Sequence, residues 1–325
     1  VLSDCMRAMD SAAYAHVLLP AAAWGEKDGT VTNSERRISR QRAFLPPPGE
    51  VRPDWWIITQ VARRMGYAQG FAYESAVEVF REHARLTGAG NEGARDFDIS
   101  ALAGLDDVAY ADLTPVQWPV NAAQPEGRAR LFADGRFYTP SGRARFIPIT
   151  PMPPAHAVDP EYPLVLNTGR VRDQWHTMTR TGKAARLCAH QPEPYIDLHA
   201  RDAARASIAD GSLVRVSSRW GEIIVRARVS EHQRPGEVFV PMHWNDQYAS
   251  QARVGAVVNP AVDPVSGEPE FKHTPVNIQP YQPQWYGFLL SRRRLLMPGA
   301  AYWVVAKGDN VWRYEIAGDQ PPDDW

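Results

Sequence analysis

A run of short apolar segments between Pro163 and Trp244 limits the fold of this chain more than any other feature. Four segments in this run have the composition of strands and are bounded by turn residues, namely PLVLNTG, PYIDLH, SLVRVSS and PGEVFVPMHW. The turn RWGE joins SLVRVSS to IIVRARV, which predicts a β-hairpin. Many short strands separated by turns are typical of a barrel or a sandwich and disfavour a doubly wound sheet. ARDAARASIADG, between the second and third segments, predicts a short helix that ends in a turn.

The first 155 residues have a mixed α/β pattern instead. VLSD and HVLLPAAAW read as apolar strands, and residues 54–66 predict an amphipathic helix. Its apolar residues recur at helical spacing, and Gly66 is placed to end it; they are Trp56, Ile57, Val61 and Met65. Residues 71–87 predict a second helix, whereas residues 88–140 are irregular. PMPPAHAVDPEYP then has the composition of a linker between domains.

Composition excludes several classes of protein. Lys and Arg number 36 and Asp and Glu number 37, so the net charge of −1 gives no electrostatic basis for binding nucleic acid or a membrane surface. No apolar run approaches 18 residues, so no membrane-spanning helix is expected. Cys5 and Cys188 lie far apart and form neither a disulfide framework nor a CxxC metal site. The chain starts without Met, inside a predicted strand, which suggests a piece of a longer polypeptide.

Two polar segments are candidates for binding a ligand. EKDGTVTNSERR, residues 26–37, surrounds Gly29 with charged, hydroxyl and amide groups, and the alternative is an exposed turn whose ion pairs contribute little. NTGRVRDQWHT, residues 167–177, follows a predicted strand and offers a guanidinium, hydroxyls and close backbone approach at Gly169. These donors suit a pyrophosphate or a polar heterocycle. The alternative for this segment is a polar hairpin loop.

The residues themselves give no catalytic centre. No HExxH, GxSxG, P-loop or GxGxxG motif is present. His243 follows a strand without a second His at metal spacing, so a structural role is favoured over metal ligation. His199 and Asp202 have no partner nucleophile and are also interpreted as structural. The sequence therefore predicts binding without self-contained catalysis, and no metal-ligating residue.

Taken together, these blocks resemble the C-terminal half of the bacterial molybdopterin oxidoreductases, with the assimilatory nitrate reductases as the most similar branch. The resemblance covers nearly the whole chain. The blocks that carry it are VLSD, HVLLPAAAWGEKDGTVTNSERR, PPGEVRPDW, NTGRVRDQWHTMTRTG, IADGSLVRVSSRWGEIIVRARV, PMHW, RVGAVVNPAVDPVSGEPEFKHTPV and the tail WYGFLLSRRRLLMPGAAYWVV. Their order and spacing make the resemblance specific.

The resemblance implies a set of cofactor-binding residues and no catalytic residue in this chain. The family positions fall on Ser3, Asp4, Lys27, Thr30, Asn33, Asp54, Thr168, Gly169, Arg170, Gln174, Trp175, His176, Thr177, Gly255 and Lys272. Gly255 stands where the family has an asparagine that reaches the cofactor, so either its backbone N–H replaces that contact or the contact is lost. Arg170, His176 and Thr177 have donors suited to pyrophosphate and pterin oxygens.

The resemblance also implies the architecture. Residues 1–155 would be the C-terminal part of the molybdopterin oxidoreductase α/β domains, and residues 156–282 a double-psi β-barrel that binds the molybdopterin dinucleotide. Residues 283–325 would be a C-terminal extension. The implied cofactor is molybdenum with two molybdopterin guanine dinucleotides, and a [4Fe-4S] centre and the Cys that ligates molybdenum would lie in the missing N-terminal half.

The activity implied for the parent enzyme is the reduction of nitrate to nitrite in the cytoplasm, with an electron-donor protein or domain as partner. The fragment by itself is expected to be inactive. One alternative is a fragment of a formate dehydrogenase or of another molybdoenzyme. Another is a stand-alone, non-enzymatic barrel module that binds a nucleotide or a protein.

Overall fold

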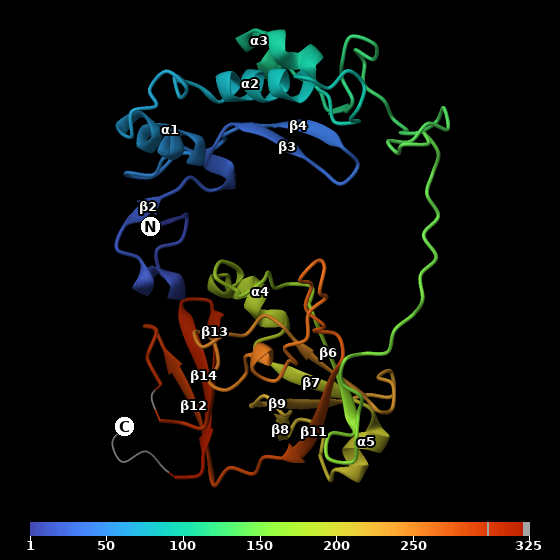
Figure 1. Cartoon of the computed structure of the whole chain (residues 1–325). Coiled ribbons are helices and arrows are strands. Elements are labelled where there is room, and N and C mark those ends of the chain that lie inside the picture. The colour runs from blue at the N-terminus through green and yellow to red at the C-terminus, as the bar shows by residue number, and fades with distance from the viewer. Residues whose placement is uncertain (298, 321–325) are drawn as a thin grey trace. The chain divides into compact units, whose positions relative to one another are not determined.

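The computed structural model describes residues 1–297 and 299–320, and the chain divides into two compact units (Figure 1). The first unit is Val1–Ile149 and the second is Thr150–Trp325. In the described residues, no helix combines the length and the apolar character needed to cross a membrane. The same residues contain no group of three or more His, Cys, Asp or Glu side chains placed to hold a metal ion.

The first unit begins with two short parallel strands, β1 (Leu2–Asp4) and β2 (Leu18–Pro20). Helix α1 (Asp54–Arg64) follows, and Gly66 adopts a φ of 96° just after it, which only glycine reaches at little cost. The predicted strand at VLSD and the predicted helix are thus both confirmed. The apolar face of α1 is largely exposed, since Val61 is 49% and Met65 67% accessible to solvent.

An antiparallel sheet and two further helices complete this unit. The sheet contains β3 (Gly29–Thr32), β4 (Arg37–Gln41) and β5 (Val116–Gln117). Helix α2 (Ala76–Gly88) begins five residues later than the sequence pattern predicts, because Glu78 accepts hydrogen bonds from the backbone N–H groups of Glu74 and Ser75. Such bonds satisfy donors at a helix start. Short helical segments fill the loops, namely α3 (Asp107–Ala111), η1 (Asp10–Tyr14), η2 (Trp24–Glu26) and η3 (Ser100–Gly104).

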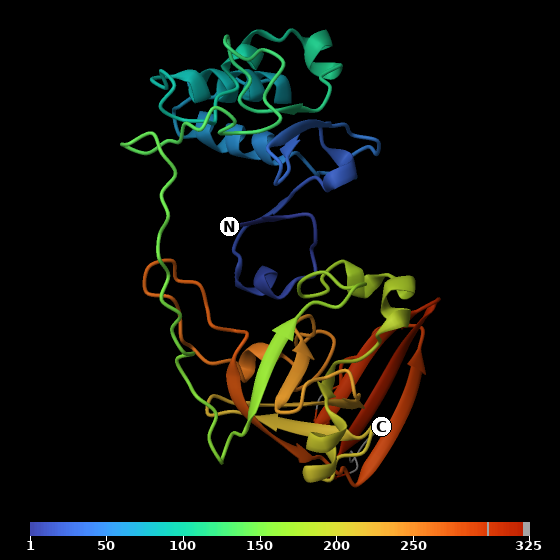
Figure 2. The same ribbon diagram turned by 90° about the vertical axis from the view of Figure 1, so that its right-hand side faces the viewer.

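The second unit, seen from two sides in Figure 1 and Figure 2, is built on a closed six-stranded barrel. The strand order of the barrel is β10-β6-β11-β8-β9-β7. The strands are β6 (Leu164–Gly169), β7 (Tyr195–Leu198), β8 (Leu213–Ser217), β9 (Glu222–Val229), β10 (Glu237–Pro241) and β11 (Thr274–Pro280). The predicted hairpin is confirmed as the antiparallel pair β8–β9. Two pairs, β6–β10 and β7–β9, are parallel, and both join strands that are distant in sequence. Helices α4 (Ala185–His190) and α5 (Ala200–Arg205) and the turns η4 (Thr181–Lys183) and η5 (Val254–Ala256) connect the strands.

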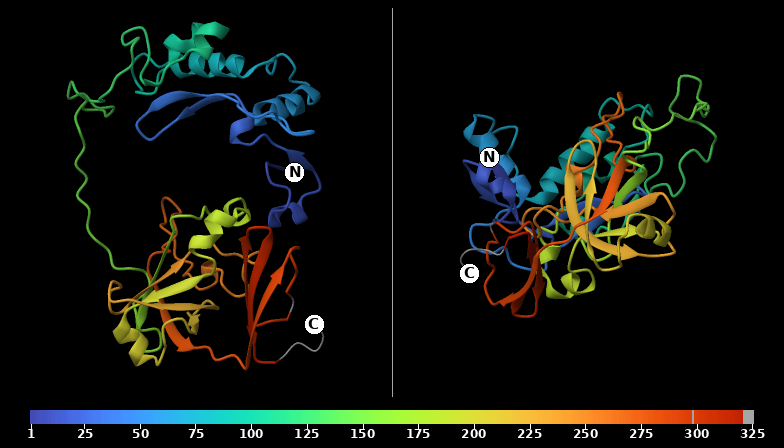
Figure 3. Two further views of the ribbon diagram at one scale, coloured as in Figure 1. Left: turned by 180° about the vertical axis from the view of Figure 1, so that it is seen from behind. Right: turned by 90° about the horizontal axis from the view of Figure 1, so that it is seen from below.

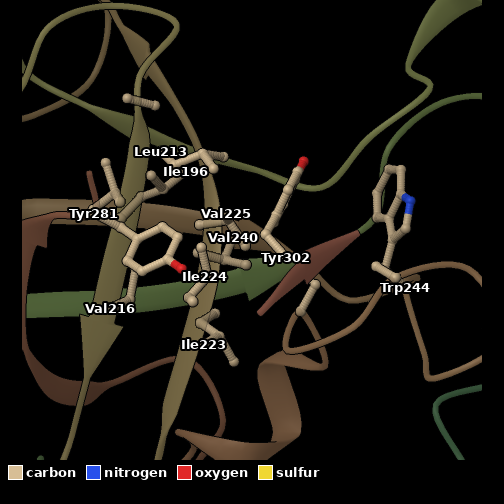
Figure 4. Close-up of a cluster of buried hydrophobic side chains, with 14 of the residues drawn as sticks. Ile196, Leu213, Val216, Ile223, Ile224, Val225, Val240, Trp244, Tyr281 and Tyr302 are labelled. Carbon is tan, nitrogen blue, oxygen red and sulfur yellow. The ribbon is translucent and has the colours of Figure 1, made fainter. Parts of the chain in front are cut away.

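The C-terminal residues form a three-stranded antiparallel sheet beside the barrel (Figure 3). Its order is β12-β14-β13, with β12 (Trp285–Ser291), β13 (Tyr302–Gly308) and β14 (Val311–Gly318). Tyr302 and Trp244 lie in one buried cluster with barrel residues such as Val225 and Val240 (Figure 4). The described part of the predicted extension therefore shares the hydrophobic core of the barrel.

Candidate functional site

The candidate site in the second unit is built where two parallel strands end side by side. Strands β6 and β10 pair in register, with Thr168 opposite Val240 and Gly169 opposite Pro241. The backbone N–H of Met242 then donates to the carbonyl oxygen of Gly169 at 2.9 Å. The loops that follow the two strands therefore leave the barrel together. Open ends of parallel strands are a common place for ligand sites, because loops from different parts of the chain converge there.

Thr168, Gly169, Arg170 and Lys272 come together at this end of β6. The ammonium group of Lys272 donates to the carbonyl oxygen of Thr168. A Cβ on Gly169 would lie 3.1 Å from the ring of Phe239 and 3.6 Å from Nζ of Lys272, so little room exists for a side chain. Among the described residues, neither Arg170 nor Lys272 forms an ion pair with a carboxylate, and Arg170 instead lies 4.8 Å over the ring of Trp175.

This group of residues fits an anionic ligand. A phosphate-bearing molecule needs cations that are not already neutralised by carboxylates and a backbone that it can approach closely. This end of β6 offers both. The Oγ1 atom of Thr168 supports this, because it is buried and has no hydrogen-bond partner. An unpaired buried hydroxyl costs free energy unless a ligand or water bonds to it.

The remaining predicted residues of this loop serve different purposes. The Gln174 side chain is buried and used within the protein, since it donates to the carbonyl oxygen of Leu187 at 3.2 Å and accepts from Thr181 at 2.7 Å. Trp175, His176 and Thr177 are exposed. The rings of Trp175 and His176 meet edge to face at 4.4 Å, and the two hydroxyls of Thr177 and Thr179 lie 3.0 Å apart. His176 has a φ of 43°, which is uncommon for a residue with a side chain.

His243 is a residue of this site that sequence reasoning did not connect with it. Its ring is completely buried, with Nδ1 2.7 Å from the carbonyl oxygen of His176 and Nε2 accepting from the N–H of Val171 at 2.9 Å. Burial lowers the pKa of His243 below the ordinary histidine value, and the nearby charge of Arg170 acts in the same direction. The structural role expected for this histidine is therefore the bracing of the candidate loop. Its position just after a predicted strand was the only sequence signal, and nothing in the sequence indicated that this strand pairs with β6.

Gly255 lies away from the contacts of this loop. It sits in η5, exposed, and its neighbour Ala256 packs against the β8–β9 turn. The carbonyl oxygen of Ala256 lies 2.5 Å from the place where a Cβ on Gly221 would be. In the described part of the chain, no hydrogen bond joins Gly255 to the end of β6, so the contact of its backbone N–H with the cofactor stays a prediction.

The first unit holds a second group of predicted residues. Ser3 and Asp4 end β1, and the carbonyl oxygen of Asp4 accepts from the N–H of Ala21 just after β2. Lys27 and Asp54 meet in an ion pair of 2.9 Å at the first turn of α1. Asp4 lines a cavity of about 480 Å³ with the end of β2. Parallel strand ends and a helix start thus converge on this group as well.

Thr30 and Asn33 lie apart from these contacts, on the β3–β4 hairpin. Thr30 is paired opposite Arg40 in the sheet. The side chain of Asn33 accepts from the N–H groups of Glu35 at 2.9 Å and Arg37 at 3.0 Å, and so shapes the turn itself. Neither residue is brought next to Lys27 or Asp54 by a hydrogen bond that the structure records.

Both groups lie in segments that match known protein families. Residues 164–275 match the Molydopterin dinucleotide binding domain, and residues 1–64 match the Molybdopterin oxidoreductase family, so the two matches together cover more than half of the chain. The chain belongs to the molybdopterin oxidoreductase family. The barrel match includes β6, the candidate loop and Lys272, and the other match includes the group at β1 and α1.

Individual relatives agree with this family, and a solved structure shares the fold. The chain is similar to a nitrate reductase of Klebsiella oxytoca, with 44% identity over 325 residues, which are 100% of this chain and 37% of that protein. It is also similar to a formate dehydrogenase subunit alpha of Methanocaldococcus jannaschii, with 34% identity over 83% of this chain and 37% of that protein. The acetylene hydratase of Pelobacter acetylenicus has a similar fold, with a TM-score of 0.58, 19% identity, and coverage of 82% of this chain and 38% of that one. The chain thus spans little more than a third of the length of these relatives.

Proposed function

We propose that this chain is the C-terminal part of a molybdenum-dependent nitrate reductase, which converts nitrate to nitrite, and that its barrel binds the dinucleotide end of the cofactor. The observation that carries the proposal is the group at the end of β6, where Arg170 and Lys272 lack carboxylate partners and the Thr168 hydroxyl is buried without a bond. The identity of 44% to a nitrate reductase along the whole chain supports the substrate.

The implied cofactor is molybdenum held by two molybdopterin guanine dinucleotides, which supplies two-electron redox chemistry when bound. Arg170 and Lys272 would neutralise its phosphates, and Thr168 would donate a hydrogen bond that a phosphate or pterin oxygen accepts. The exposed side chains of Trp175, His176 and Thr177 would contact its less charged parts. Ser3, Asp4, Lys27, Thr30, Asn33, Asp54 and Gly255 stay proposed contacts on the resemblance alone.

Further features of the parent enzyme belong to the same proposal. The barrel is proposed to be of the double-psi type, a topology with which the two parallel pairs β6–β10 and β7–β9 are consistent. A [4Fe-4S] centre outside this chain would pass electrons from a donor protein or domain, and the enzyme would act in the cytoplasm on assimilated nitrate. The domain limits at residues 155 and 282 are proposed on the same basis.

Calorimetry with GDP, which carries the guanine and the phosphates of the cofactor, tests the binding site. We expect Arg170→Gln to weaken binding roughly tenfold or more, because a charge-assisted hydrogen bond is lost. Arg172→Gln is the matched control, since Arg172 is 74% exposed and already paired with Asp173 at 3.0 Å. Equal binding by wild type and Arg170→Gln would remove this residue from the proposed site.

An activity assay on the full-length protein tests the substrate. Nitrite formation with a reduced viologen as electron source is expected. The relative from M. jannaschii makes formate the second candidate, so formate oxidation without nitrate reduction would replace nitrate by formate. The intact mass of the native protein distinguishes a part of either enzyme from a stand-alone binding module. A native product of about 36.3 kDa would contradict the proposal that this chain is part of a longer enzyme.

A further inference from the structure

His243 is held in one protonation state by its partners. The carbonyl oxygen of His176 can only accept a hydrogen bond, so Nδ1 of the ring must carry a proton. The N–H of Val171 can only donate, so Nε2 must be unprotonated. The two partners together are satisfied only by the neutral ring with its proton on Nδ1.

The two partners are the ends of the candidate ligand loop. Val171 directly follows Arg170, and His176 is the residue with the left-handed backbone at φ 43°. One side chain thus fixes the separation of both ends and supports a backbone conformation that is costly by itself. Asn245 adds a bond to the carbonyl oxygen of Thr177 at 3.3 Å, and Tyr248 adds one to that of Met178 at 3.0 Å.

The ring itself has a rigid attachment. His243 follows β10 by two residues, and the next residue, Trp244, is 1% exposed and belongs to the buried core of the second unit (Figure 4). The groups whose charges act on the ring are Arg170 and His176, both basic and both on the loop that the ring braces. Protonation would therefore add a positive charge close to that of Arg170 and point a second donor at the N–H of Val171.

We propose that His243 is a positioning residue, whose neutral ring holds residues 171–176 in the ligand-binding conformation and whose protonation releases them. The part about the ligand rests on the proposed function. The release itself is a property of the loop and is measurable without any ligand. Because burial lowers the pKa of this histidine, the neutral ring persists at pH 7, and the brace is lost as the pH falls below the ordinary value of about 6.5.

The first test observes the wild-type chain directly. The ¹⁵N shifts of the histidine rings report which nitrogen carries the proton and the pH at which each ring titrates. We expect His243 to carry its proton on Nδ1 and to titrate below the ordinary histidine value of about 6.5. A proton on Nε2, or titration at or above that value, would overturn the proposal without any variant that has to fold.

The second test is hydrogen exchange of the chain between pH 8 and pH 5, corrected for the intrinsic rate. Peptides that cover residues 168–178 are expected to lose protection as the pH falls, whereas the β8–β9 hairpin keeps it. In His243→Asn the amide replaces only the Nδ1 donor, so the loop should exchange about tenfold faster at pH 8 and show no further pH dependence. His232→Asn is the control and should behave as wild type.

Binding of GDP then connects the brace to the ligand. Affinity is expected to fall between pH 8 and pH 5.5 in wild type and in His232→Asn, and to be weak at both pH values in His243→Asn. Loop protection that does not depend on pH, or that survives in His243→Asn, would refute the positioning role. If the loop opens as expected but GDP binds nowhere, the brace is supported and the proposed function is what fails.

Discussion

The ion pairs of Arg226 lead to a sharp prediction about what holds the C-terminal sheet to the barrel. Arg226 on β9 donates to Glu193 at 2.6 Å, to Glu315 on β14, and to the carbonyl oxygen of Gly211 at 2.7 Å. Tyr302 on β13 also donates to Glu193, at 3.1 Å. The side chains of the three charged residues are only 18–20% exposed. One guanidinium therefore neutralises two poorly hydrated carboxylates from different parts of the second unit.

Arg226→Met keeps the apolar part of this side chain and removes its charge. Removing one partner of a buried ion pair typically costs 3–5 kcal/mol, and because these groups keep some solvent contact we expect about 3 kcal/mol. For a unit of this size that corresponds to a lower Tm by ~6–12 °C. Calorimetric unfolding of the wild-type and variant chains measures this difference in Tm. The control is Arg253→Met, because Arg253 is 62% and its partner Asp246 65% exposed, and the expected loss is below ~1 kcal/mol.

The pH dependence of this loss tests the explanation. Burial raises the pKa of Glu315, and Arg226 acts in the opposite direction. Without Arg226 the pKa of Glu315 must rise further, so the carboxyl can take up a proton in the folded state and avoid the cost of a buried charge. In the variant, the pKa of Glu315 is higher in the folded state than in the unfolded state. The loss of stability caused by its buried charge is therefore absent below about pH 4.5 and grows as the pH rises through the pKa of the folded state. We therefore expect the Tm difference to be largest at pH 8 and small at pH 5, and a difference that is below 2 °C or independent of pH would refute the reasoning.

Two glycine substitutions test the packing of the candidate site. Gly169→Ala should weaken GDP binding several-fold with little change in Tm. The reason is that the new Cβ would lie 3.1 Å from the Phe239 ring and close to Nζ of Lys272. An unchanged affinity, measured by calorimetry, would contradict the close approach of a ligand to this backbone. Gly182→Ala should instead lower the free energy of unfolding by about 1–3 kcal/mol, because its Cβ would lie 2.5 Å from the Tyr248 ring. Urea unfolding measures this free energy, and a value equal to that of wild type would contradict the predicted clash.

The local elements of the fold could be predicted from the sequence because their signals are local. Alternating apolar residues and the turn RWGE specify the β8–β9 hairpin, and Gly66 marks the end of α1. β13 and β14 also pair as neighbours along the chain. The apolar spacing predicts the start of α2 five residues too early, because it carries no information about the hydrogen bonds of Glu78 that set the boundary.

The parts that could not be predicted depend on contacts between distant segments. Local patterns left barrel and sandwich open, since closure requires the parallel pair β6–β10, whose strands are separated by three others in sequence. The apolar face of α1 has the spacing of a buried helix but is largely exposed in the described structure. Its apolar character is consistent with the proposal that further protein covers it in a longer enzyme.

The same distant pairing decides which residues make the candidate site. In the sequence, Arg170 and Thr168 belong to one loop with many hydrogen-bond donors, whereas His243 has no second histidine at metal spacing. Once β6 and β10 lie in parallel register, the residue two positions after one strand reaches the loop after the other. The brace on the loop is therefore a direct consequence of the strand order, and a histidine that looks isolated in the sequence acquires both of its partners only when the barrel closes.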